Sequence, residues 1–476
     1  MAKAHSTMSR RDFLKAVGLG SAGIGAAAAL GVLPPGSPPV RDMDEVISSS
    51  LAVPNRPSYV KEVDKPTIEV DWTQIKRFDY SNVMWANGLR KAIGQPQYDT
   101  LMKAQQGNRI LRIKNNIPGH TLRDQAFVNS NINAACSFLG PGTAATPESL
   151  GVPRWEGTPE ENARMVRAFL RFHGASQVGF VELETDTTEK LIYSHDVGNG
   201  PAQGPALFIK DVDKPEDNPA DAKTGTPATR VIPKKARWVI VYTIRMADEF
   251  MRRAPTPWVV GPTMLGYTMK SVIQGSLQLF LNSLGYMGLG EASPYNNLGS
   301  AVGLGVMAGL GEHARTMHLM TPEYGLRQRL FKIITDLPLA PGKPIDFGVM
   351  RFCRVCKKCS DICPAKAING ETEPSWAALG DYQQTGIKSW HRLEPNCLSY
   401  IYQAGNSQGC ILCLAVCPLS KGKRETVYQE LMRRTVATTP TFDRAIRKLD
   451  DLMGNGQRTD AEEIWNLDLP PFGWED

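Results

Sequence analysis

The sequence predicts an α+β protein with a large core and a smaller cysteine-rich domain near its C-terminus. Helical and extended patterns alternate between residues 160 and 284, and eight of the nine cysteines fall between Cys353 and Cys417. A hydrophobic content of 42% over 476 residues is enough to bury a substantial core. The net charge of +6 is small and dispersed, so nucleic acid is not an expected partner.

The N-terminus is typical of an export signal, predicted to span residues 1–33. Ser9-Arg10-Arg11-Asp12-Phe13-Leu14-Lys15 is a twin-arginine signature, and an uncharged run rich in Gly and Ala follows it. This run is weakly apolar for a membrane span, which needs about twenty predominantly apolar residues. Residues 34–140 are predicted to be a linker rich in Pro and Ser, followed by an N-terminal region with little regular pattern.

The predicted core covers residues 141–345. Thr158-Pro159 is a plausible start for a helix that ends at Phe172, since apolar residues recur there at helical spacing. A second helix, rich in small residues, is expected over residues 264–284. Strands are expected at residues 178–183, 190–194 and 238–244, with a long loop or insertion at 196–235.

The stretch from Gly285 to Gly311 is rich in glycine and almost without charge. Glycine lets backbone approach a ligand closely, so the stretch could form a wall against a large flat cofactor. Close packing of helices explains it equally well. The candidate cofactor contacts are Gly285, Gly288, Gly290, Gly303 and Gly305. No phosphate-binding loop motif occurs, so nucleotide binding gains no support.

A cysteine-rich domain is predicted over residues 346–425. Its first motif, C-x2-C-x2-C-x3-C-P, runs from Cys353 to Pro364 and has the spacing of bacterial ferredoxins, in which the fourth cysteine reaches to a second cluster. A second motif runs from Cys410 to Pro418. The predicted ligands of one 4Fe–4S cluster are Cys353, Cys356, Cys359 and Cys417, and those of the other are Cys363, Cys410, Cys413 and a fourth residue.

The fourth ligand of the second cluster is displaced. Ferredoxin spacing places a cysteine three residues before Cys410, where Ser407 stands, so Cys397 is the candidate, delivered by a loop from Leu398 to Gly409. Structural zinc is the alternative, since paired cysteines also bind zinc, but zinc explains neither C-x3-C-P ending. Cys136 is expected to be a small buried residue.

The last predicted segment, residues 426–476, contains an amphipathic helix and a tail. Thr439-Pro440 is expected to begin the helix, with Phe442, Ile446, Leu449 and Leu452 on one face.

These features together resemble the respiratory reductive dehalogenases. The resemblance extends from the export signal and both cysteine motifs to Gly311-Glu-His-Ala-Arg315, Thr321-Pro-Glu-Tyr-Gly325, Arg329 and Thr335-Asp-Leu-Pro-Leu339. It implies a nitroreductase-like core that holds a corrinoid without a protein ligand below the cobalt. No histidine here has Asp two residues before it, so the D-x-H-x-x-G motif of His-ligated cobalamin is absent from the sequence.

The resemblance also implies an activity, namely reduction of an organohalide by low-valent cobalt. Thr263-Met-Leu-Gly-Tyr267 matches the family pattern for the proton donor, which makes Tyr267 the candidate. Its basic partner would be Arg329, with Arg327 and Arg315 as alternatives. Asn296 or Asn297 would orient the substrate or the donor. Three tryptophans are candidates for an apolar substrate pocket or for core packing: Trp155, Trp376 and Trp390.

Family members are terminal reductases on the outer face of the cytoplasmic membrane, so the implied partners are a small hydrophobic membrane anchor protein and an upstream respiratory electron donor. Two rival functions remain open. One is an exported two-cluster electron carrier, which leaves the long core unexplained. The other is an epoxyqueuosine reductase-like corrinoid enzyme, which would act on tRNA in the cytoplasm and does not need an export signal.

Overall fold

The computed structural model describes residues 56–129, 136–197, 204–292, 296–405, 409–421, 427–452 and 460–474. These residues all belong to one compact unit, Ser50–Asp476. The expected export signal lies outside the described residues, as does the linker up to residue 55. The boundaries expected at residues 140, 345 and 425 fall inside this compact unit and stay predictions.

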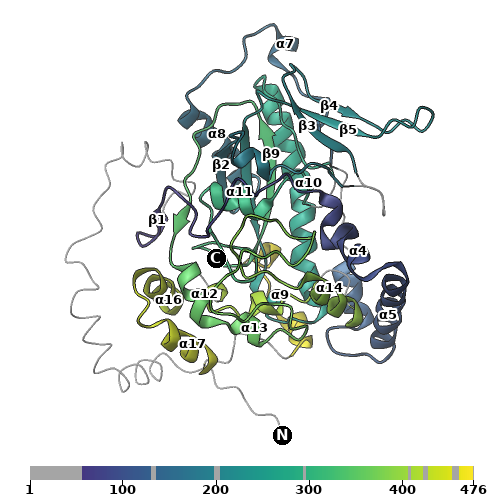
Figure 1. Cartoon of the computed structure of the whole chain (residues 1–476), viewed down its shortest axis with the longest axis vertical. Coiled ribbons are helices and arrows are strands. Elements are labelled where there is room, and N and C mark those ends of the chain that lie inside the picture. The colour runs from purple at the N-terminus through teal and green to yellow at the C-terminus, as the bar shows by residue number, and fades with distance from the viewer. Residues whose placement is uncertain are drawn as a thin grey trace, which may run out of the picture. The chain divides into compact units, whose positions relative to one another are not determined.

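A three-stranded antiparallel sheet forms the centre of the core (Figure 1). Its order is β2 (Gln177–Glu182), β6 (Trp238–Arg245) and β9 (Gln328–Thr335), so β6 is paired on both sides. Successive side chains of β6 point to opposite faces. Val239 and Val241 therefore enter one hydrophobic cluster, whereas Ile240 and Tyr242 enter another. Both faces of the sheet are thus buried.

Helices cover both faces of this sheet. On one face, α8 (Pro159–Phe172) and α10 (Val260–Ser283) pack in the same cluster as Ile240. On the other face lies α11 (Ala301–Met307) (Figure 1). Helix α8 begins at the capping box of Thr158 and Glu161, which satisfies two backbone N–H groups at its start. The result is a helix–sheet–helix core.

The expected helices and strands are confirmed in part. The helices at 159–172 and 264–284 are present, the second beginning earlier, at Val260. The strands at 178–183 and 238–244 are also present. The expected strand at 190–194 is wrong, because Thr188–Leu191 forms a 3-10 turn (η3). Of the long loop or insertion expected at 196–235, the loop alternative is wrong in part, because the segment contains the sheet of β3 (Ala206–Lys210), β5 (Thr229–Pro233) and β4 (Glu216–Asn218).

The N-terminal region supplies helices that pack against the cysteine-rich segment. Helices α4 (Leu89–Ile93) and α5 (Gln95–Lys114) contact α14 (Glu394–Gln403) along an apolar cluster that includes Leu89, Leu101 and Leu398. Three further helices of the N-terminal region and the core are α6 (Leu122–Asn129), α7 (Pro147–Leu150) and α9 (Asp248–Met251). Two pairs of short strands complete these parts: β1 (Lys61–Glu62) with β10 (Ile345–Asp346), and β7 (Glu312–His313) with β8 (Leu319–Met320).

Five helices complete the cysteine-rich segment and the C-terminus: α12 (Val349–Cys356), α13 (Lys358–Asp361), α15 (Leu412–Ala415), α16 (Val427–Thr438) and α17 (Asp443–Leu452). Helix α17 begins a few residues later than expected. Its predicted apolar face is only partly correct, because Ile446 is buried whereas Leu452 is 84% exposed. In the described part of the chain, no helix combines the length and apolarity needed to cross a membrane.

Candidate functional site

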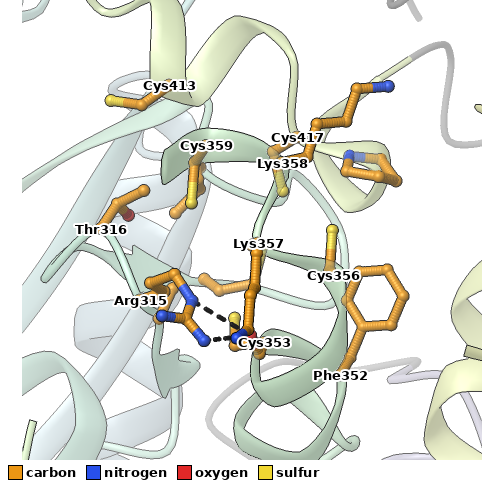
Figure 2. Close-up of a pocket in the computed structure, with 14 residues that line it drawn as sticks. Arg315, Thr316, Phe352, Cys353, Cys356, Lys357, Lys358, Cys359, Cys413 and Cys417 are labelled. Carbon is orange, nitrogen blue, oxygen red and sulfur yellow. Dashed lines mark hydrogen bonds between the residues drawn. The ribbon is translucent and has the colours of Figure 1, made fainter. Parts of the chain in front are cut away.

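The first group of cysteines surrounds a single pocket. Cys353 and Cys356 lie in α12, Cys359 lies in α13, and Cys417 follows α15. Figure 2 shows the thiols of Cys356, Cys359 and Cys417 directed into a common space, whereas the thiol of Cys413 points away from it. The structure therefore groups the four cysteines that were expected to share one cluster.

The second group also comes together. Cys363 packs in one small cluster with Cys397 and Cys413, which Cys359 of the first group also borders. The thiol of Cys413 interacts electrostatically with those of Cys397, Cys410 and Cys363. Cys397 lies in the first turn of α14. The expected loop from Leu398 to Gly409 is wrong, because this helix continues to Gln403. Cys397 is therefore held by a helix, although its ligand role stays a prediction.

Both cysteine groups fit iron–sulfur clusters. All nine cysteines are free. Burial raises the pKa of Cys353 and Cys356 to about 12 and that of Cys410 to about 11. These thiols are therefore protonated at neutral pH unless a metal replaces the proton. The backbone N–H groups of Lys358 and Leu412 point at the sulfurs of Cys356 and Cys410, as is usual around cluster ligands.

The candidate proton donor Tyr267 lies on α10, beside Arg329 of β9. The Arg329 guanidinium carbon is 5.4 Å from the centroid of the Tyr267 ring, and Phe331 contacts the same ring at 5.7 Å between centroids. Arg329 also donates a 2.8 Å hydrogen bond to Oγ1 of Thr263, one turn before Tyr267. Gly266 makes this approach possible, because a Cβ there would lie 3.0 Å from Cγ of Arg329.

The other two candidate arginines lie elsewhere. Arg327 forms an ion pair with Asp248, at 3.2 Å between Nη1 and Oδ1. Arg315 lines the pocket of the first cysteine group and lies over the ring of Trp390, 4.2 Å from its centroid. Of the three candidates, the structure therefore brings only Arg329 to Tyr267. The catalytic roles of both residues stay predictions.

A buried ionic network that the sequence did not indicate involves the same helix and strand, α10 and β9. Lys270 of α10 and Lys332 of β9 both approach Glu291, with Nζ–Oε distances of 3.6 Å and 2.5 Å. All three side chains are fully buried. Lys332 also donates a hydrogen bond to Oδ1 of Asn296, whereas Asn297 donates to Asp196. Asn296 is therefore held in place by the strand that carries Arg329.

The five glycines that were predicted to contact a cofactor lie mostly against protein atoms. A Cβ at Gly290 would meet Gln274 at 2.3 Å, and one at Gly305 would meet Leu330 at 2.7 Å. Gly285, Gly288 and Gly303 are similarly close to side chains. Packing thus accounts for these five glycines, and their role beside a cofactor stays a prediction. Gly285 and Gly288 also line a surface cavity of about 690 Å³.

Two buried polar atoms in the β7–β8 hairpin have no protein partner in the described part of the chain, and Thr316 also lines the pocket of the first cysteine group. Thr316 Oγ1 and His313 Nδ1 are buried, and neither has a hydrogen-bond partner among the described residues. A buried polar group without a partner is costly, so each is suited to a bound group. Of the three candidate tryptophans, Trp390 is buried and packs under Arg315, whereas Trp155 and Trp376 are at least 40% exposed, so core packing accounts for Trp390 alone.

The fold and the cysteine groups define the class: an α+β core joined to a domain for two 4Fe–4S clusters. Residues 352–420 match the 4Fe-4S double cluster binding domain. Residues 55–142 and 128–339 match the reductive dehalogenase subunit family, and the chain belongs to this family. The membership supports the expected α+β fold with a ferredoxin-like domain and both expected cofactors, the clusters and a corrinoid.

Three similar proteins match this chain over different shares of its length. A trichloroethene reductive dehalogenase of Dehalococcoides mccartyi is 27% identical over 99% of this chain and 98% of its own. A tetrachloroethene reductive dehalogenase of Sulfurospirillum multivorans is 32% identical over 66% of this chain and 61% of its own. A solved catabolic reductive dehalogenase shares the fold, with a TM-score of 0.59 and 20% identity over 86% of this chain; this chain covers 51% of that one.

Proposed function

We propose that this protein is a reductive dehalogenase that replaces a halogen of an organohalide with hydrogen, using two electrons and one proton. The observation that carries the proposal is the continuity of the match: the dehalogenase family covers the core, which contains Tyr267 and Arg329, and the double-cluster domain follows directly. An electron carrier alone does not need this core. When bound, the corrinoid supplies a low-valent cobalt that breaks the carbon–halogen bond.

Tyr267 delivers the proton in this proposal. The Arg329 cation beside its ring stabilises the phenolate that remains after the transfer. Thr263 fixes the guanidinium by its hydrogen bond, so the charge stays beside the ring. Asn296, held by Lys332, orients the substrate or the donor.

The eight cysteines deliver the electrons. Cys353, Cys356, Cys359 and Cys417 hold cluster 1, and Cys363, Cys397, Cys410 and Cys413 hold cluster 2. Two observations support this assignment: the thiols of Cys356, Cys359 and Cys417 face one pocket, and Cys413 interacts electrostatically with Cys397, Cys410 and Cys363. Purified holoenzyme should then contain about eight irons for each cobalt.

Chlorinated ethenes are the substrate class that we propose first, because the relatives above are named for trichloroethene and tetrachloroethene. Halide release should be measured with chlorinated ethenes, alkanes and aromatics, with reduced viologen as the donor. Release from ethenes alone supports the proposal. No release from any class by enzyme loaded with iron and cobalt would contradict it.

The matched test of the site is Tyr267→Phe. We expect full iron and cobalt content with turnover lowered about 100-fold or more, because general acid catalysis contributes at least that much. Tyr286→Phe is the control, since its hydroxyl donates to the carbonyl of Trp155 away from Arg329. Normal turnover in Tyr267→Phe would remove Tyr267 from the mechanism.

Export and membrane attachment complete the proposal. The twin-arginine signature supports export of the folded, cofactor-loaded protein. A small membrane anchor protein and a respiratory electron donor are the proposed partners at the outer face of the cytoplasmic membrane. Replacing Arg10 and Arg11 by Lys should leave the protein in the cytoplasm, and unchanged export would contradict the signal assignment.

A further inference from the structure

Arg315 is a buried cation at the pocket of cluster 1. It extends from the turn between β7 and β8, and its side chain is almost completely buried. Nε and Nη2 donate to the carbonyl of Cys353 at 3.1 Å and 2.7 Å, as Figure 2 shows. Nη1 donates to the carbonyls of Asn369 and Glu371, both at 2.7 Å. All of its hydrogen-bond partners are therefore neutral carbonyls.

The charge of Arg315 is not neutralised locally. Across the part of the chain that the structure describes, no carboxylate lies within 4.0 Å of its guanidinium. The buried carboxyl in the same hairpin, Glu312, forms no ion pair with Arg315: it accepts from the backbone N–H groups of Phe347 and Val349, although its charge also acts on Cys353. The charge of Arg315 acts on the sulfurs of Cys353, Cys359 and Cys356 and also on Asp361, which is itself paired with Arg447.

Other cations near cluster 1 have anionic partners. Lys358 and Lys421 both bind Asp450, and Lys358 also binds Asp451. Arg447 pairs with Asp361. The ammonium of Lys357 bonds to the hydroxyl of Thr372 at the exposed surface, where water screens it. Arg315 is thus the source of an uncompensated buried charge at this cluster.

The arginine beside cluster 2 has a different environment. Arg392 acts on the sulfurs of Cys397 and Cys413, but its Nη2 lies 3.4 Å from Oε1 of Glu394. The pair carries no net charge. The two clusters therefore differ by about one buried positive charge, and the net charge around a cluster helps to set its reduction potential.

We propose that Arg315 raises the reduction potential of cluster 1 above that of cluster 2, so that cluster 1 takes the first electron. Reduction adds one electron to a cluster and makes it more anionic, so a fixed cation stabilises the reduced form. The electron comes from an external one-electron reductant such as dithionite. This inference rests on the cluster assignment of the proposed function.

The test is a redox titration of holoenzyme, followed by electron paramagnetic resonance of both reduced clusters. Arg315→Gln should lower the higher potential by at least a tenfold change in the reduction constant, which is about 59 mV for one electron. Arg315→Lys keeps the charge and should shift it by less. Arg354→Gln is the matched control, because Arg354 is next to Cys353 in sequence but is 42% exposed and paired with Glu373. It should cause no shift.

The reciprocal variant is Glu394→Gln, which removes the partner of Arg392 and should raise the lower potential instead. Unchanged potentials in Arg315→Gln with full iron, or equal shifts in the Gln and Lys variants, would overturn the proposal. If Arg315→Gln does not retain iron, Glu394→Gln decides, and an unmoved lower potential overturns it. Iron content and halide release, measured on the same samples, separate a failed cluster assignment or a failed dehalogenase function from a failed charge effect.

Discussion

The two cysteine motifs share a turn but differ in what supports them. Each has a residue in the left-handed region directly after a cysteine, Lys357 (φ 51°) after Cys356 and Ile411 (φ 44°) after Cys410. Each turn then begins a short helix, α13 or α15, that carries the next cysteine. The repeated turn shows that cluster geometry is encoded locally in both halves.

The supports come from different parts of the chain. The first motif is held by α17, where Arg447 donates to the carbonyl of Cys356 and Asp450 binds Lys358. The second motif depends on α14, which carries Cys397 and packs on α4 and α5. Each cluster can therefore be disturbed through its own support, and the predictions below use this difference.

The largest effect is expected for Cys397→Ser. It removes the only proposed ligand of cluster 2 that stands outside the two motifs, so about half of the iron and most of the turnover should be lost. Iron analysis and electron paramagnetic resonance check this. Cys136→Ser is the control, since Cys136 belongs to neither group. Retention of both cluster signals in Cys397→Ser would mean that another residue is the ligand.

Asp450→Asn should disturb only the first cysteine motif and cluster 1. It leaves the buried ammonium groups of Lys358 and Lys421 without their shared partner, which should cost about 3–5 kcal/mol. Denaturant unfolding and retention of the cluster 1 signal measure the loss. Asp451→Asn is the control, since the Asp451 side chain is 45% exposed and should matter little. Similar losses in both variants would contradict the buried-charge explanation.

Glu312 should make the stability of the folded protein depend on pH. Burial raises its pKa from 4.5 to about 7, so the folded chain binds this proton more tightly than the unfolded chain. The stability that protonated Glu312 contributes is complete below its unfolded pKa and is lost as pH rises through the folded pKa. Glu312→Gln should therefore raise the melting temperature relative to the natural protein near pH 8 more than near pH 5. A pH-independent difference would exclude this titration.

The smallest effect is expected from glycine in the two turns. Lys357→Gly removes the steric cost of a side chain in the left-handed region and should stabilise the protein by about 1 kcal/mol. Ile411→Gly relieves the same conformation but also removes a side chain that packs against two apolar clusters, so its gain should be smaller or reversed. Denaturant midpoints compare the two. Equal gains in stability would mean that packing of the Ile411 side chain does not stabilise its turn.

The sequence allowed the cysteine groups to be predicted because their spacing is local. Cys353, Cys356 and Cys359 lie within two turns of chain, so few backbone paths can place them differently. The pairing of Tyr267 with Arg329 was chosen by resemblance among three arginines. The structure separates them because Arg327 and Arg315 meet other partners.

The buried network of Lys270, Glu291 and Lys332 could not be predicted, since it joins a helix, a loop and a strand that are distant in sequence. A lysine within the apolar strand β9 was the available signal. The wrong strand at residues 190–194 has a related cause. Its apolar residues are buried in the core cluster that contains α11, and the segment pairs through isolated bridges such as the one to Gly299, so tertiary packing overrode the local pattern.

Gly266 sets how closely α10 and β9 approach each other beside Tyr267 and Arg329. The missing side chain is what allows the helix bearing Tyr267 and the strand bearing Arg329 to approach. A single methyl group there would displace the cation by a few tenths of an ångström while leaving both functional groups in the chain. The distance between the Arg329 guanidinium and the Tyr267 ring thus depends on the residue at position 266, so it could be changed without exchanging either side chain.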